Sequence, residues 1–292
     1  MHAVTLSFAL VWFALYIIQE QGISVEVWKP RMALKTGIAL VSVEDAVEPS
    51  FLYALRSSQN DRELARIVFD EVHLVQDHAS FREAMSRVWR LAQLEVPFVW
   101  LTATMPPAKE EMLARSLKTS FRTMRERTSR PDVEYVVVDG NENIKRSVFS
   151  CIITKFFERF WQQDKTTRCI VYCLYKQEAM DFADEFRLDT GQTCSVLHAE
   201  MSDEDKKDAY DCWKGGQHPI MFATQAFGAG IDYPSVRLVL HVGMPTSLSG
   251  FAQESGRLSR DGAGGLAYVM TSSQVRRRYM AINEDDEDGE YS

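Results

Sequence analysis

The chain has 292 residues, of which 46% are hydrophobic and 25% charged, as is typical of a soluble globular protein with two domains or one long one. The net charge of −8 disfavours a nucleic-acid partner, but six of the acids lie in the segment EDDEDGE at 284–290, and without them the charge is −2. Local basic surfaces therefore remain possible. The five cysteines are irregularly spaced and form no C-x-x-C pair, which argues against a disulfide framework or a zinc site.

The segment 3–18 holds 16 residues without a charge. A membrane helix needs about 20 such residues. A signal peptide needs a basic start and a small-residue cleavage site, which this segment lacks. We predict a buried strand followed by a buried helix, with no membrane association. A membrane-anchored protein is the alternative that hydropathy leaves open.

Short β-rich runs alternate with helical patterns along the rest of the chain, which predicts βαβ units and parallel sheets flanked by helices. The predicted strands are 38–43, 67–69, 98–102, 133–138, 168–173, 194–198, 219–223, 237–242 and 266–271. Two helix starts are also readable, at the prolines 106 and 107 and at Ser202, an N-cap whose helix stops at Gly215.

A polar break at 139–146 divides these strands into two sets. We therefore predict an α/β fold with one lobe at 1–139 and a second at 147–275. A tail at 276–292, first basic and then acidic, is expected to be disordered.

The sequence IVFDEVH places Asp70 and Glu71 directly after an apolar strand, with His73 two residues later. The carboxyl end of a strand in a parallel sheet is where α/β proteins bind nucleotides. In a nucleotide hydrolase the first acid holds Mg²⁺ and the second polarises the attacking water. By themselves, these residues fit the start of a solvated loop equally well.

Three later segments offer chemistry of the same kind. In LTATMPP the hydroxyls of Thr102 and Thr104 could bond the acids of the neighbouring strand, although Thr104 could equally be a helix N-cap. In FATQAFGAGIDYP the glycines let backbone amides approach a phosphate, or simply allow a tight connection. In FAQESGRLSRDG, Arg257 and Arg260 lie three apart on one expected helical face, where they suit a phosphate or are solvated.

Taken together, the order D-E-x-H, T-A-T, a glycine loop and Q-x-x-G-R-x-x-R resembles superfamily 2 helicases, and most of all the RecQ DNA helicases. The resemblance runs from about Gly22 to Thr271 and implies two RecA-like lobes. It also implies ATP-driven 3′-to-5′ unwinding in DNA repair or recombination, with ATP and Mg²⁺ but no zinc. The expected partner is single-stranded DNA or a duplex with a single-stranded tail. The expected location is intracellular, at the chromosome in the nucleus if the cell is eukaryotic.

By this resemblance, Asp70 would hold Mg²⁺ and Glu71 would be the general base. The other implied roles fall into four groups: coupling between the lobes or to DNA (His73, Gln253, Thr102, Thr104), contact with the nucleotide (Gly230, Asp232), contact with DNA (Phe81, Arg82, Thr224), and γ-phosphate contact (Arg257, Arg260). Arg260 is the better candidate for an arginine finger.

The sequence departs from the family in several ways. No G-x-x-x-x-G-K-[ST] phosphate loop occurs, so we expect a first lobe that is incomplete at its N-terminus, weak ATP affinity and negligible hydrolysis by the chain alone. The loop LVQDHASFR is shortened and lacks the family's tryptophan, and Ser259 replaces a usual glycine. A non-catalytic nucleic-acid-binding or scaffold protein is the main alternative, and an RNA helicase is another.

Overall fold

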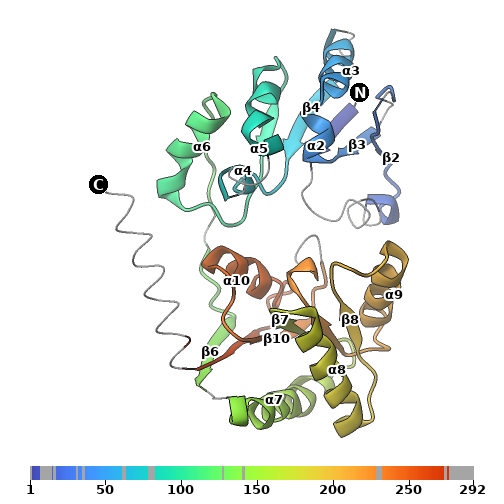
Figure 1. Cartoon of the computed structure of the whole chain (residues 1–292), viewed down its shortest axis with the longest axis vertical. Helices are drawn as coiled ribbons and strands as arrows, with labels where there is room; N and C mark the ends of the chain where they lie inside the picture. Colours follow the sequence, from blue (N-terminus) through green and yellow to red (C-terminus); the bar gives the residue numbers. More distant parts are fainter. Residues whose placement is uncertain are drawn as a thin grey trace. The chain divides into compact units, whose positions relative to one another are not determined.

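The computed structural model describes residues 2–6, 15, 18–30, 32–34, 37–60, 64–77, 83–126, 128–139, 142–227, 232–272 and 275 (Figure 1). The chain divides into two compact units, Met1–Arg127 and Thr128–Ser292, called unit 1 and unit 2 below. In both units every pair of neighbouring strands is parallel among the described residues. This confirms the predicted α/β class.

The described part of unit 1 holds a five-stranded sheet in the order β2-β3-β1-β4-β5. The strands are β1 (His2–Leu6), β2 (Val25–Val27), β3 (Gly37–Val41), β4 (Leu64–Phe69) and β5 (Phe98–Trp100). Strand β1 pairs with β3 on one side and β4 on the other, so the predicted first strand lies inside the sheet. Among the described strands β5 pairs with β4 alone and forms the sheet edge.

Helices pack on this sheet through one apolar core. They are α2 (Val43–Ala46), α3 (Pro49–Asn60), α4 (Leu74–Asp77), α5 (Glu83–Arg87) and α6 (Glu110–Leu117), with 3₁₀ turns at Val88–Gln93 and Pro107–Lys109. Trp28 and Phe51, both fully buried, meet edge to face at 4.7 Å in this core. As predicted, proline starts the helical segment before α6, with Pro107 at its first position.

Unit 2 holds a six-stranded sheet in the order β6-β11-β10-β7-β9-β8 among its described residues. The strands are β6 (Val133–Asp139), β7 (Arg168–Cys173), β8 (Ser195–Leu197), β9 (Ile220–Ala223), β10 (Val236–Val242) and β11 (Gly265–Thr271). Every residue of the central strands β7 and β10 is buried, as expected for a parallel sheet covered on both faces.

The helices of unit 2 are α7 (Glu142–Phe156, continued by a π turn at Phe157–Trp161), α8 (Lys176–Thr190), α9 (Asp203–Lys214) and α10 (Leu248–Ser255), with a 3₁₀ turn at Gln225–Phe227 (Figure 1). Ser202 caps α9 by accepting a hydrogen bond from the Asp205 amide, as predicted. Rings of α7 and α8 meet at Phe149 and Phe182 against one face of the sheet. Phe251 of α10 packs on His241, whose side chain leaves β10 on the opposite face.

The predicted boundary between the lobes was wrong. We placed the strand at 133–138 in the first lobe, but β6 pairs with β11 along its whole length and is the edge strand of unit 2. The division between the units falls at residues 127 and 128, before this strand, and not at the polar break at 139–146. The three-residue strand β2 was not predicted.

Two predictions fall largely outside the described residues. Beyond β1, the uncharged segment 3–18 is described only at residues 15 and 18, and the tail 276–292 is not described. In the parts of the chain that are described, no helix has the length and apolar character needed to cross a bilayer.

Candidate functional site

The acid pair lies where the sequence predicted it, directly after β4 at the carboxyl end of the sheet of unit 1. The Glu71 amide donates to Asp70 Oδ1 at 3.1 Å, and Glu71 has a left-handed backbone with φ of 53°. A residue other than glycine with this backbone is held there by its surroundings, and such strain is frequent at functional sites.

Burial raises the pKa of the Asp70 carboxyl above its ordinary value, and the hydrogen bond from the Glu71 amide opposes this shift only in part. A partly desolvated carboxylate at a strand end is a good ligand for a hard divalent cation such as Mg²⁺. Within the described ranges no three His, Cys, Asp or Glu side chains gather around a common point. Mg²⁺ is usually held by one or two carboxylates together with oxygens from water and substrate, and Asp70 could be one such carboxylate.

His73 and Thr102 join the ends of β4 and β5. His73 Nδ1 lies 2.8 Å from Thr102 Oγ1 and 3.3 Å from Glu71 Oε2, and the histidine is buried. The backbone supports this arrangement, because the Val72 amide donates to the Leu101 carbonyl at 2.9 Å. The structure thus brings together three of the predicted residues, and the histidine connects the second acid to the threonine segment.

Two expectations for the threonines were wrong. Among the described residues the Thr102 hydroxyl bonds His73 rather than Asp70 or Glu71, and it also accepts a hydrogen bond from the Thr104 amide at 3.3 Å. Thr104 is not a helix N-cap either, since the next helical turn begins at Pro107 with Pro106 at its N-cap. The buried Thr104 hydroxyl has no hydrogen-bond partner among the described residues.

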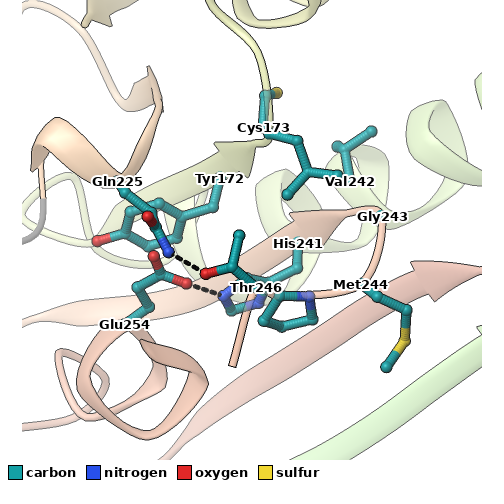
Figure 2. Close-up of a pocket in the computed structure, with 11 residues that line it drawn as sticks. Tyr172, Cys173, Gln225, His241, Val242, Gly243, Met244, Thr246 and Glu254 are labelled. Atoms are coloured by element: carbon teal, nitrogen blue, oxygen red, sulfur yellow. Dashed lines mark hydrogen bonds and ion pairs between the residues drawn. The ribbon is translucent and has the colours of Figure 1, made fainter. Parts of the chain in front are cut away.

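Unit 2 has a pocket at the carboxyl ends of β7 and β10 (Figure 2). His241 Nε2 and Glu254 Oε2 are 2.8 Å apart, and both side chains are buried. The Tyr172 ring stacks on the His241 ring with 5.4 Å between centroids. At the pocket, Gln225 donates to the Thr246 hydroxyl (Figure 2).

Our reading of the sequence missed Tyr172, His241 and Glu254 as site residues. For Tyr172 and His241 the available signal was a polar side chain within a mostly apolar strand, RCIVYC or VRLVLHV, whereas Glu254 lies in α10. Burial raises the pKa of the Tyr172 hydroxyl to about 12, while the positive charge of Arg257 acts in the opposite direction. Arg257 is itself buried, and it lies close enough to Tyr172 for its charge to act on that hydroxyl.

The two arginines do not share a helical face, which corrects another prediction. Helix α10 ends at Ser255, and a turn follows in which Ser259 has a left-handed backbone with φ of 49°. Arg257 is buried, whereas Arg260 is exposed and pairs with Asp232 at 2.7 Å. Glycine adopts a left-handed backbone without the steric cost of a Cβ atom, which explains why it is usual at the position of Ser259 in the helicases that this sequence resembles.

The remaining predicted residues either adjoin residues of the unit 2 pocket in sequence or lie outside the described residues. Thr224 follows β9, is half-buried, and its amide donates to the Leu197 carbonyl at 3.2 Å. Gln253 is half-buried in α10. Phe81, Arg82 and Gly230 lie outside the described residues.

Residues 147–262 match the family model "Helicase conserved C-terminal domain". Among curated proteins, the chain is 30% identical to the RecQ-like DNA helicase BLM of Xenopus laevis over 231 residues, which cover 77% of the chain and 16% of that protein. It is 29% identical over 230 residues to the putative ATP-dependent RNA helicase R290 of Acanthamoeba polyphaga mimivirus, covering 76% of the chain and 40% of that protein. These matches support a superfamily 2 helicase.

The chain spans 40% or less of the length of these helicase relatives. Among solved structures, S. cerevisiae Dbp5 bound to RNA and ADP BeF3 matches with a TM-score of 0.72, at 15% identity, over 96% of this chain and 73% of that chain. Mycobacterium smegmatis helicase Lhr bound to ssDNA and AMP-PNP matches with a TM-score of 0.64, at 17% identity, over 93% and 40%. At these identities the likeness shows the fold alone, which is RecA-like as predicted.

Proposed function

We propose that this chain is part of a RecQ-like, ATP-dependent DNA helicase that moves 3′ to 5′ and acts in DNA repair or recombination. The observation that carries the proposal is the cluster at the carboxyl edge of unit 1, where Asp70 precedes a connected Glu71, His73 and Thr102. The order of the later segments and the BLM relative support the choice of DNA and of the RecQ type.

In this proposal Asp70 would hold Mg²⁺, which supplies charge neutralisation at the phosphates, and Glu71 would be the general base toward water. The raised pKa of Asp70 supports its role, because a bound cation would favour the charged form that burial disfavours. His73 contacts both Glu71 and Thr102, so a movement of the segment after β4 would be transmitted to the segment after β5. Thr104, whose hydroxyl has no hydrogen-bond partner among the described residues, is proposed to link hydrolysis to the DNA-holding state together with Thr102, and Gln253 is proposed to couple the lobes together with His73.

The nucleotide phosphates would meet Arg257 and Arg260, with Asp232 holding Arg260 until a phosphate replaces it. Gly230, Thr224, Phe81 and Arg82 keep their proposed nucleotide and DNA contacts on the strength of the resemblance. ATP supplies the phosphoryl group whose transfer drives such enzymes. The 292 residues contain no G-x-x-x-x-G-K-[ST] loop, which is the usual cradle of the β-phosphate, so we propose no hydrolytic step for this chain alone.

A non-catalytic nucleic-acid-binding protein is the second candidate, and the missing phosphate loop favours it. Both candidates predict binding to a single strand, but only the helicase predicts a use for the acid cluster. An RNA helicase is a third reading, since the relatives include the putative RNA helicase R290.

Fluorescence anisotropy of the purified chain separates the DNA reading from the RNA reading and tests whether the chain binds nucleic acid. The probes are a labelled single-stranded DNA, an RNA of the same sequence, and DNA duplexes with a 3′ or a 5′ tail. We expect tighter binding to DNA than to RNA and to the 3′ tail than to the 5′ tail. Tighter binding to RNA would overturn the assignment to DNA, and no binding to any probe would overturn both nucleic-acid readings. Thr224→Val should weaken binding to all DNA probes alike if Thr224 contacts the backbone.

A further inference from the structure

The turn that carries the two arginines is fixed by residues at the start of unit 2. Arg130 Nη2 donates to the Leu258 carbonyl at 2.6 Å and to the Ser259 carbonyl at 3.3 Å. Both acceptors lie between Arg257 and Arg260 in sequence. One guanidinium therefore holds the backbone of the turn at its centre.

Asp132 orients this guanidinium. Arg130 Nε and Nη2 donate to the two carboxylate oxygens of Asp132 at 3.1 and 2.9 Å, a bidentate arrangement that fixes the plane of the arginine. This ion pair shifts the pKa of both side chains. Hydrogen bonding to Asp132 raises the pKa of Arg130, and the same contact holds the pKa of Asp132 well below its usual range.

Further contacts close the turn around Ser259. The Ser259 amide donates to the Val236 carbonyl at 2.9 Å, and the Gly264 amide donates to the Ser259 hydroxyl at 2.7 Å. The Gly265 amide donates to the Asp132 carbonyl at 3.0 Å. The Asp132 carbonyl thus fixes the chain at Gly265, just after the turn. The Asp132 side chain orients Arg130, which bonds the carbonyls at the centre of the turn.

We propose that Arg130 is a positioning residue that sets the conformation of the turn at 256–262, and that Asp132 orients Arg130. This conformation keeps the Arg257 side chain buried and the Arg260 side chain exposed. Arg130 is the third residue of unit 2, so the chain segment that enters this unit is itself bonded to the arginine turn. The value of this arrangement for phosphate binding rests on the proposed function, but the positioning itself does not.

The test measures the reactivity of Arg260 in the free protein with the arginine reagent phenylglyoxal, followed by mass spectrometry. The reference in the same sample is Arg146, an exposed arginine of α7 that pairs with Glu185 at 3.3 Å. In the wild-type chain Arg260 is held by Asp232. We expect Arg130→Met to raise the ratio of Arg260 to Arg146 modification severalfold, because the turn loses the bonds that hold Arg260 beside Asp232. Arg130→Lys keeps the charge but not the fork, and should fall between the two.

Arg187→Met is the matched control. Arg187 also bridges a carboxylate and a backbone carbonyl in unit 2, donating to Asp184 Oδ1 at 2.7 Å and to the Cys194 carbonyl at 3.2 Å. Its loss should leave the Arg260 ratio unchanged.

Amide hydrogen exchange of the peptide covering 256–264 gives a second measurement. We expect exchange roughly tenfold faster in Arg130→Met, since a charged donor to two carbonyls is lost. Unchanged exchange together with an unchanged Arg260 ratio would overturn the proposal, as would an equal rise in the Arg187→Met control. No nucleotide or nucleic acid enters either measurement, so failure here would leave the proposed function untouched.

Discussion

Ser259 provides a quantitative test of the strained turn. Its backbone is left-handed, its side chain is buried, and its hydroxyl accepts the Gly264 amide at 2.7 Å. Ser259→Ala removes the hydroxyl but leaves a Cβ in the left-handed region. Ser259→Gly removes both. The difference between the two variants therefore isolates the backbone strain from the hydrogen bond.

The magnitudes follow from these two contributions. A hydrogen bond of this kind contributes about 1 kcal/mol to stability, and a left-handed backbone costs a residue with a Cβ about 1 kcal/mol or more relative to glycine. We expect Ser259→Ala to be about 1 kcal/mol less stable than the wild-type chain. In Ser259→Gly the lost bond and the relieved strain should nearly cancel. For a unit of this size 1 kcal/mol corresponds to a shift in Tm of roughly 2–4 °C.

Thermal unfolding followed by circular dichroism would measure the three proteins. The control is Ser116 in α6, whose hydroxyl bonds the Met112 carbonyl at 3.0 Å within a right-handed helix. There the order must reverse, with Gly less stable than Ala by up to about 1 kcal/mol. Equal losses for Ser259→Ala and Ser259→Gly would refute the claim that strain is stored at this turn.

Three further predictions concern charged side chains. Burial raises the pKa of Asp70 in the folded chain, so the stabilising contribution of this carboxyl is present only in acid and is lost as the pH rises through that pKa. Asp70→Asn should therefore raise Tm at pH 7 and not at pH 3. Mg²⁺ should raise the Tm of the wild-type chain but not that of Asp70→Asn. Arg237 holds the pKa of Asp261 at about 2, so this pair stabilises the fold above the ordinary carboxyl pKa, and the contribution is lost as the pH falls through about 2. Asp261→Asn should therefore lower Tm at pH 7, and its effect should shrink toward zero as the pH falls to about 2 and below. Arg168 is buried and donates to the Trp213 and Lys214 carbonyls at the end of α9 at 2.5 and 3.1 Å; Arg168→Met should cost roughly 2–4 kcal/mol in urea unfolding, and a loss under 1 kcal/mol would contradict this role.

Much of the fold was readable because local signals agreed with the tertiary structure. The strand at 168–173 is mostly apolar apart from Arg168 at its start, and Ser202 is a cap with strong local preference, so both were predicted at their observed positions. The assignment of β6 failed because strand pairing is a long-range property. The polar break at 139–146 reads as a boundary, but β6 pairs with β11, a strand more than a hundred residues later.

The site was predicted in part for the same reason. Residues that follow a strand end directly, such as Asp70 and Glu71, were placed correctly because the strand itself was predicted. The partner of Thr102 was not, since its contact with His73 depends on side-chain orientation across two strands. The spacing of Arg257 and Arg260 suggested a helix, but helix α10 ends at Ser255 and the turn that follows has a left-handed backbone at Ser259. Contacts of this kind need the folded backbone.

The most direct test of Asp70 and Glu71 as the metal-and-water half of an ATPase site is phosphate release from ATP by the purified 292-residue chain, with and without single-stranded DNA. Since these residues include no phosphate loop, we predict no DNA-stimulated hydrolysis above background and no difference between wild type and Glu71→Gln. A DNA-stimulated rate that collapses in Glu71→Gln would contradict this prediction. It would show that the chain binds the ATP phosphates through other residues.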